Sequence, residues 1–243
     1  MAIIDNLLFR AGTTDAADRE FSNSLSGRLN RLRAGVLGAN DGIVSTAAII
    51  LGVAGATSTR TSILIAGVVG LLAGAMSMAV GEYVSVSTQR DTERSVIARQ
   101  RRRMAEDPAG EQAALAAVYR EKGLDHELAS RVADELTRND GLRAHAETRL
   151  GVDPNEFTQP GHAALASFLS FVIGAAIPLA GVVIAPTAWL TVAAVAIALA
   201  LTGAVSARLG RAPVGPAVLR NVAGGLVAMG VTFGLGTLIG GLF

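Results

Sequence analysis

The chain has no cysteine, few aromatic residues and almost no net charge. Its 243 residues include 28 glycines, 4% aromatic residues and a formal net charge of +1 at pH 7. The absence of cysteine excludes disulfides, thiolate metal sites and thiol redox chemistry. A net charge near zero gives no global attraction to nucleic acid, which we do not expect as a partner. No nucleophile–base pair and no cofactor loop occurs in the sequence, so we expect neither an enzyme nor a cofactor.

Charged residues are missing from two long stretches. No ionisable residue occurs from Ala163 to Ala207 or from Asn221 to Phe243. A helix needs about 20 apolar residues to cross the hydrocarbon core of a bilayer. The first stretch is therefore long enough for two passes and the second for one. Abundant glycine and alanine are typical of membrane helices that pack closely.

We predict an all-α integral membrane protein with about five transmembrane helices and a helical insert between the second and third. The expected spans are residues 34–56, 62–88, 161–184, 187–207 and 218–242. The expected domains are an N-terminal lead-in at 1–33, transmembrane helices 1 and 2 at 34–88, a charged helical domain at 89–160, and transmembrane helices 3 to 5 at 161–243. The lead-in lacks the apolar core of a signal peptide.

Arginines in the short loops indicate the orientation. The loops expected on one side contain Arg28, Arg31, Arg33, Arg208, Arg211 and Arg220, against only Arg60 on the other. Positive residues are enriched in cytoplasmic loops. We therefore expect the N-terminus and residues 89–160 in the cytoplasm, and the C-terminus on the opposite side.

The charged segment contains residues that are typical of the ends of several helices. Asp107-Pro108 should end the helix that begins in the second span, because proline cannot continue it. The following helices should be bounded by cap residues at Gly123, Asp125 and Gly151. Short amphipathic helices are marginal alone, so they should pack on each other, on the membrane domain or on a second copy.

The first candidate site is Asn40-Asp41-Gly42, followed by Ser45, inside the first span. An ionisable residue in hydrocarbon costs about 2.5–3.5 kcal/mol on insertion scales, so it usually faces a bundle interior or an aqueous path. We interpret Asp41, with Asn40 and Ser45, as part of a transport pathway. Alternatively, Asp41 lies at the cytoplasmic interface and only caps or anchors its helix.

The second candidate is Met78 with Glu82, four residues apart on one face of the second span. A thioether and a carboxylate on one stripe suit a borderline-soft ion such as Fe²⁺ or Mn²⁺. Methionine at helical spacing is more often only packing. The expected membrane metal ligands are Asp41, Met78 and Glu82. The two carboxyl groups are also natural proton carriers, because a desolvated carboxyl group holds its proton more firmly.

Two further groups of residues are expected to lie mainly on the surface. The histidines have no clear ligand partner at helical spacing, unless His145 pairs with Glu147 across the end of a turn, and are expected on the surface: His126, His145 and His162. A basic run after the second span is expected to be a solvated helix face or a contact with anionic lipid headgroups: Arg99, Arg101, Arg102 and Arg103.

The membrane motifs resemble a known family. Residues 32–45 resemble the first-helix signature of the vacuolar iron transporter family of iron and manganese transporters, and residues 73–78, 81–85 and 89–93 resemble its second helix. The resemblance covers nearly the whole chain after Arg28. It implies five transmembrane helices, a homodimer, a metal path between the first and second helices of the two subunits, and proton-coupled antiport of Fe²⁺ or Mn²⁺ out of the cytoplasm.

The resemblance also assigns residues to metal. By motif, Asp41 and Met78 fall on the family's membrane metal residues, and Glu82 falls on a glutamate common in bacterial-looking members. In the cytoplasmic segment the family gathers several glutamates from three helices. The corresponding positions here hold Gln100, Arg103, Glu111, Ala114 and Arg149, with Glu147 nearby. We therefore expect only weak metal binding, at Glu111 and Glu147.

The main expectation is a homodimeric transporter that exports Fe²⁺ or Mn²⁺. The alternative is a non-transporting membrane scaffold whose basic cytoplasmic helices bind anionic lipid or a protein partner. Loss of the acidic ligands favours the alternative, and carboxylates inside the membrane oppose it.

Overall fold

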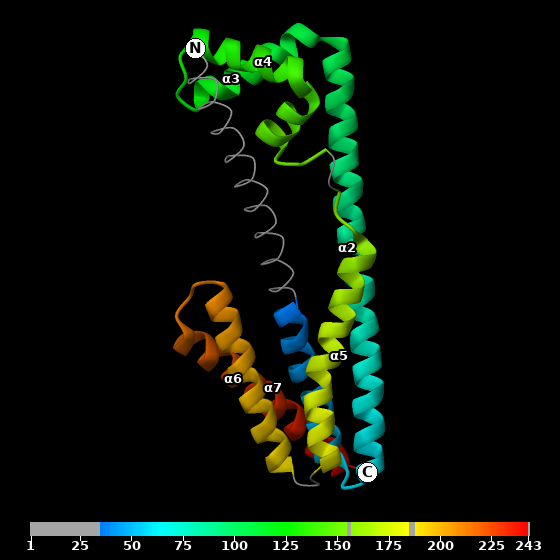
Figure 1. The fold of residues 1–243 in the computed structure, drawn as a ribbon. Coiled ribbons are helices and arrows are strands. Elements are labelled where there is room, and N and C mark those ends of the chain that lie inside the picture. Colours follow the sequence, from blue (N-terminus) through cyan, green and yellow to red (C-terminus); the bar gives the residue numbers. More distant parts are fainter. Residues whose placement is uncertain (1–34, 155–156, 185–187, 243) are drawn as a thin grey trace, which may run out of the picture. The chain divides into compact units, whose positions relative to one another are not determined.

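A computed structural model describes residues 35–154, 157–184 and 188–242, and all regular structure in these ranges is helical. Its helices are Gly35–Ala56, α2 (Arg60–Glu106), α3 (Pro108–Glu121), α4 (His126–His145), the π-helix η1 (Ala146–Leu150), α5 (Pro160–Ile184), α6 (Ala188–Leu209) and α7 (Val214–Gly240) (Figure 1). The expected lead-in at 1–33 lies outside the described residues.

Five helices are long and apolar enough to cross a membrane: Gly35–Ala56, α2, α5, α6 and α7. The predicted fold class is thereby confirmed. Helix α2 contains 47 residues, a length of about 70 Å at 1.5 Å per residue. The hydrocarbon core is only about 30 Å thick, so a large part of α2 extends beyond it. The helix ends directly before Asp107-Pro108, as that motif predicted.

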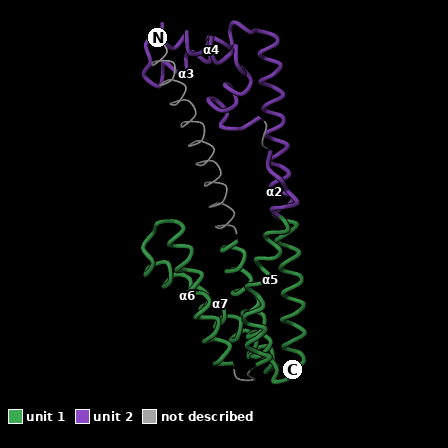
Figure 2. The backbone as a smooth tube through the Cα atoms, in the orientation of Figure 1, with its two compact units in different colours: residues 1–80, 164–243 green, residues 81–163 purple. Residues whose placement is uncertain are grey.

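The chain divides into two compact units (Figure 2). Met1–Val80 with Ala164–Phe243 form one, here called the membrane unit, and Gly81–Ala163 form the other, here called the insert unit. Helix α2 contributes residues to both. The candidate residues Asp41 and Met78 belong to the membrane unit, whereas Glu82 belongs to the insert unit.

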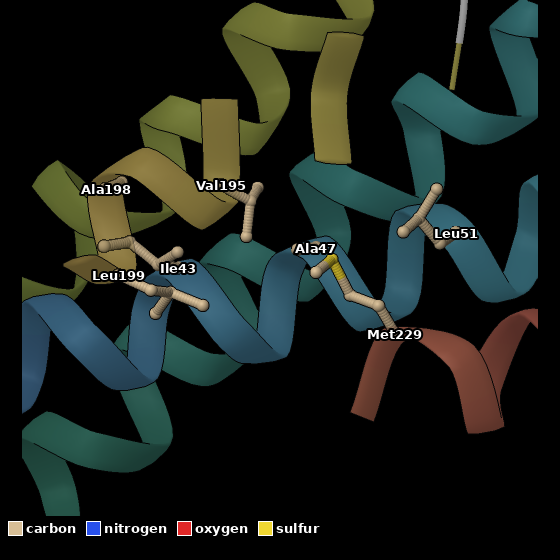
Figure 3. Close-up of a cluster of buried hydrophobic side chains, with 7 residues drawn as sticks. All are labelled: Ile43, Ala47, Leu51, Val195, Ala198, Leu199 and Met229. Carbon is tan, nitrogen blue, oxygen red and sulfur yellow. The ribbon is translucent and has the colours of Figure 1, made fainter. Parts of the chain in front are cut away.

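The Gly35–Ala56 helix is the most enclosed span of the membrane unit. Its apolar stretch is 44% buried, the largest share among the five spans, although its mean hydropathy is the lowest. Ile43, Ala47 and Leu51 lie on its buried face and pack against a common cluster from α6 and α7 that contains Val195, Ala198, Leu199 and Met229 (Figure 3). Burial by neighbouring helices thus compensates for the low hydropathy of this span.

Glycines allow two very close crossings of this helix. A Cβ atom at Gly42 would collide with the carbonyl oxygen of Phe171 on α5, and one at Gly174 would collide with the carbonyl oxygen of Ala39. Near the other end, a Cβ at Gly236 on α7 would collide with the backbone carbonyl of Gly52. Small residues allow helix backbones to approach in this way in membranes. The helix is therefore held by α5 near its start and by α7 near its end.

The caps expected in the insert unit are present. Asp107 accepts a hydrogen bond from Gly110 N at 2.9 Å, and Asp125 accepts one from Leu128 N at 2.8 Å. Gly123 has φ +100° and Gly151 has φ +65°, the left-handed conformation that glycine adopts most easily.

A buried apolar cluster joins α3 and α4. Its members are Leu115, Ala116, Ala133 and Ala144. Packing of this kind supports helices that would be marginal in isolation. The expectation that the short helices pack on each other is confirmed.

Candidate functional site

Asp41 lies on the exposed side of the Gly35–Ala56 helix. The next two residues, Gly42 and Ile43, are buried, so this turn of the helix has one exposed side and one buried side. The hydroxyl of Ser45 donates to the backbone carbonyl of Asp41 at 2.6 Å. This bond commits the hydroxyl proton of Ser45 to the backbone and leaves the lone pairs of its oxygen, together with the Asp41 carboxylate, as the side-chain acceptors of this turn.

The thioether of Met78 lies beside the same helix. A Cβ atom built at Gly38 would be 3.7 Å from Met78 Cε and 2.9 Å from Ser170 Cβ. Gly38 precedes Asp41 by one helical turn. Met78 also packs against the buried cluster of Ala75, Phe171 and Ala175. The side chain therefore contributes to packing and lies close to the Asp41 turn.

Glu82 follows Met78 by one turn of α2 and is half-buried. It belongs to the insert unit. Within the membrane unit, Met78 lies beside the helix that carries Asp41.

A polar cluster inside the membrane unit was missed by sequence reasoning. The side-chain oxygen of Asn40 accepts hydrogen bonds from Asn221 Nδ2 at 3.0 Å and from Thr202 Oγ1 at 3.3 Å. These donors come from α7 and α6. The sequence did contain one indication of this cluster: Thr202 and Asn221 are isolated polar residues near the ends of the uncharged segments. Polar residues at such positions often form hydrogen bonds between membrane helices.

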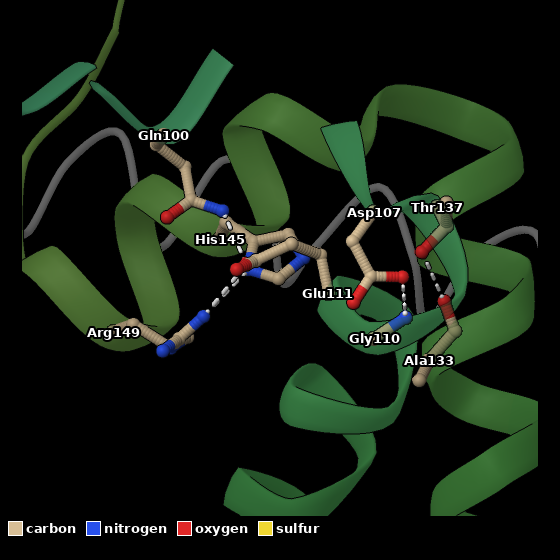
Figure 4. Close-up of polar contacts among 8 residues, drawn as sticks. All are labelled: Gln100, Asp107, Gly110, Glu111, Ala133, Thr137, His145 and Arg149. Carbon is tan, nitrogen blue, oxygen red and sulfur yellow. Dashed lines mark hydrogen bonds and ion pairs between the residues drawn. The ribbon is translucent and has the colours of Figure 1, made fainter. Parts of the chain in front are cut away.

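A second polar cluster lies in the insert unit, around the carboxylate of Glu111 (Figure 4). Glu111 Oε2 accepts from Gln100 Nε2 at 2.7 Å and from Arg149 Nη1 at 2.8 Å. The Nδ1 atom of His145 is 3.5 Å from the same oxygen. The cluster thus joins α2, α3, the end of α4 and η1 through one half-buried carboxylate.

His145 corrects an expectation. It was expected on the surface, but its side chain is only 1% exposed, whereas His126 and His162 are exposed as predicted. Burial lowers the pKa of His145 below its ordinary value of 6.5; the negative charge of Glu111 opposes this shift and the positive charge of Arg149 adds to it. The error arose because Glu111 lies far from His145 in the sequence, and no local spacing indicates their contact.

Glu147 does not join Glu111. Its carboxylate instead accepts a hydrogen bond from Arg143 Nε at 2.6 Å, which raises the pKa of Arg143. Within the described residues, no group of three or more His, Asp or Glu side chains could hold a metal ion. The two weak insert ligands that we expected thus bind different arginines.

The arginine run of α2 is solvent-exposed: Arg99, Arg101, Arg102 and Arg103. None of these side chains takes part in the Glu111 cluster. Their exposure agrees with a solvated helix face and also leaves them free to meet an anionic surface.

Comparison with known proteins identifies the family. A profile of the VIT family matches residues 32–237, which is most of the chain. The chain belongs to the vacuolar iron transporter (VIT) family. It is 39% identical over 231 residues to a vacuolar iron transporter from Acanthamoeba castellanii, an alignment that covers 93% of this chain and 85% of that protein.

Plant members are similar over nearly the same length. The chain is 38% identical over 215 residues to vacuolar iron transporter homolog 5 of Oryza sativa subsp. japonica, covering 87% of this chain and 81% of that protein. It is 37% identical over 217 residues to homolog 2.1 of Arabidopsis thaliana, covering 88% and 83%. Membership of a transporter family confirms the expected family and the expectation that the chain is not an enzyme.

The insert unit differs from the glutamate cluster that the resemblance implied. Three positions assigned to that cluster, Gln100, Glu111 and Arg149, do meet in this VIT-family chain. Only one of them is acidic. The guanidinium of Arg149 lies on the carboxylate where a metal ion would need an open ligand, and its charge repels a dication.

Proposed function

We propose that this VIT-family chain is a homodimeric divalent-metal transporter that exports Fe²⁺ or Mn²⁺ from the cytoplasm in exchange for protons. The observation that carries the proposal is Asp41, a carboxylate within the most enclosed membrane span and one turn from the glycine beside Met78. The vacuolar iron transporters among its relatives support iron as cargo.

The proposed ligands have complementary roles. The carboxylate of Asp41 supplies the charge that compensates a dication after it loses part of its water shell. The thioether of Met78 adds a soft, neutral ligand that favours Fe²⁺ over the harder Mg²⁺ or Ca²⁺. Glu82, one turn further along α2, is the further carboxylate of the proposed transport pathway.

Proton exchange follows from the same carboxyl groups. A metal ion binds the deprotonated carboxylate, so its arrival releases a proton and its departure allows protonation. Asp41 and Glu82 can therefore carry protons into the cytoplasm as metal leaves it, and no further titratable groups in the spans are needed.

The orientation and the dimer rest on separate arguments. The arginine-rich loops favour a cytoplasmic N-terminus and insert, with the C-terminus on the opposite side. The apolar stretch of α2 is only 11% buried, the smallest share among the five spans. A second copy packed on this helix would cover part of that surface and place two α2 helices beside the path.

Transport in liposomes tests the proposal. Purified protein is reconstituted with a metal-quenched dye inside the vesicles, and Fe²⁺ and Mn²⁺ are added with and without a pH gradient. We expect metal-dependent quenching that accelerates when the interior is acidic, because internal protons then drive metal entry. Quenching equal to that of empty liposomes would overturn the proposed function.

The exposed arginines favour one second candidate, a membrane scaffold that binds anionic lipid. Four arginines in a five-residue run, Arg99 to Arg103, are all exposed on α2. Each arginine near an anionic surface contributes about 1 kcal/mol. Lipid-dependent binding of the protein to anionic liposomes, without metal flux, would support the scaffold in place of the transporter.

A further inference from the structure

We propose that Thr202 and Asn221 are positioning residues for transport. Through Asn40 they fix the rotation of the Gly35–Ala56 helix about its own axis and so set the direction of the Asp41 carboxylate. The consequence for transport rests on the proposed function, whereas the rotation itself is a property of the fold.

The contacts form a closed set across three helices. Asn221 Nδ2 lies 3.0 Å from Asn40 Oδ1, 3.4 Å from Thr202 Oγ1 and 3.4 Å from the backbone oxygen of Leu199. Thr202 Oγ1 lies 3.3 Å from Asn40 Oδ1 and 3.2 Å from the Leu199 oxygen. The single side-chain oxygen of Asn40 therefore receives one donor from α6 and one from α7.

These bonds differ in kind from the apolar contacts of the helix. The buried cluster that it forms with α6 and α7 is apolar, and apolar burial is non-directional. Hydrogen bonds weaken steeply when their geometry is lost. In an apolar surrounding an unpaired amide oxygen is costly, so a rotation that separates Asn40 from its donors is opposed.

The geometry of a helix transmits this restraint to Asp41. Successive residues of an α-helix are about 100° apart around the axis. With Asn40 held against α6 and α7, the next side chain is directed away from these two helices, and Asp41 is indeed exposed while Asn40 is half-buried. The hydrogen bonds to the Asn40 amide thus fix the rotation of the helix, and this rotation sets the direction of the Asp41 carboxylate.

The close approach of α6 and α7 at this level keeps the donors in place. A Cβ atom at Gly203 would lie 3.1 Å from Val218 Cα and 3.3 Å from Asn221 Nδ2. Such contacts are tighter than ordinary van der Waals separation. The glycine next to Thr202 therefore lets α7 come close enough for Asn221 to reach across to Asn40.

Thiol labelling of the full chain tests the rotation, because the protein has no native cysteine. Asp41→Cys introduces a thiol on the exposed side, and Ile43→Cys introduces one at a residue that is 1% exposed. The ratio of their labelling rates by a small maleimide is measured alone and combined with Asn221→Leu or Thr202→Val. We expect the ratio to fall at least about threefold in both combinations; an unchanged ratio would refute the proposed restraint.

Metal flux in chains that retain Asp41 tests the consequence. We expect Asn221→Leu to raise the KM for metal about tenfold, which corresponds to about 1.4 kcal/mol, with the maximal rate changed less. Thr202→Ser keeps the hydroxyl and should restore the KM that Thr202→Val raises. Thr232→Val is the matched control on α7, because its hydroxyl donates only to carbonyls of its own helix, at 3.0 and 3.1 Å.

The two measurements separate the possible failures. Flux absent from the unmodified protein would overturn the proposed function, while the labelling ratio still decides the restraint. A changed ratio with an unchanged KM would overturn the positioning role in transport. If Asn221→Leu does not yield folded protein, Thr202→Val alone decides, since it removes one donor and keeps the volume of the side chain.

Discussion

Removal of the guanidinium of Arg149 should loosen the insert unit. We consider Arg149→Met, which keeps an unbranched side chain and removes the positive charge. In the native structure Arg149 Nη1 is 2.8 Å from Glu111 Oε2, and the two side chains are 28% and 14% exposed. The substitution leaves a carboxylate that is largely out of water with Gln100 as its remaining close donor.

The magnitude follows from this partial burial. Exposed ion pairs contribute about 0–1 kcal/mol, and breaking a buried pair costs about 3–5 kcal/mol. A hydrogen bond to a charged group contributes about 1.5–3 kcal/mol. For a pair of intermediate exposure we expect a loss of about 2 kcal/mol in the free energy of local opening, equivalent to a roughly 30-fold loss of hydrogen-exchange protection.

The assay is amide hydrogen exchange of the full-length protein, followed by mass spectrometry of peptides from α3 and η1. Arg138→Met is the matched control: Arg138 is 69% exposed and pairs with Asp134 within the same unit. The control should reduce protection by less than about fivefold, because surface pairs contribute little. If Arg149→Met reduces protection no more than Arg138→Met, the Glu111 cluster does not stabilise the insert in the way described.

Further outcomes are expected from the two candidate sites. Asp41→Asn should abolish metal flux at normal expression, because the neutral amide cannot compensate a dication, and liposome flux at the wild-type rate would remove Asp41 from the pathway. Met78→Ala should slow flux, and Glu82→Gln should in addition alter its dependence on pH; an unchanged pH profile would exclude Glu82 as a proton carrier. Because the pKa of His145 is lowered in the folded state, the unfolded chain binds a proton below about pH 6.5 that the folded chain does not. The stability of the insert unit should therefore fall as the pH drops below this value. His145→Gln should weaken this dependence of stability on pH, as measured by hydrogen exchange. Calorimetry on the full-length protein lacking the Asp41 carboxylate should show insert binding of Fe²⁺ or Mn²⁺ no tighter than roughly millimolar, and affinity should rise markedly when glutamate replaces Gln100, Arg103, Ala114 and Arg149.

The membrane spans and the insert caps could be predicted because their signals are local. An uncharged run of sufficient length cannot be placed elsewhere than in a bilayer or a core, and Asp107-Pro108 ends a helix through the geometry of proline itself. Gly123 and Gly151 have positive φ angles, the conformation that makes glycine a marker of helix C-termini. In each case the interacting groups are a few residues apart.

The clusters around Asn40 and Glu111 could not be predicted in the same way. Asn40 and Asn221 are 181 residues apart, and Glu111 and Arg149 are 38 apart. Their contacts depend on how helices pack, and sequence periodicity defines only which face of a helix is apolar. The positions of the insert cluster were found through family resemblance, whereas their actual pairing required the structure.

The enclosure of the Gly35–Ala56 helix has a consequence for biosynthesis. This span leaves the ribosome first and has the lowest hydropathy of the five, yet its hydrogen-bond partner Asn221 follows 181 residues later. At about 5–20 residues per second, the interval between them is roughly 10–40 s. During that time the Asn40 amide lacks its donors from α6 and α7, and the newly made span lacks the helices α5, α6 and α7 that pack against it.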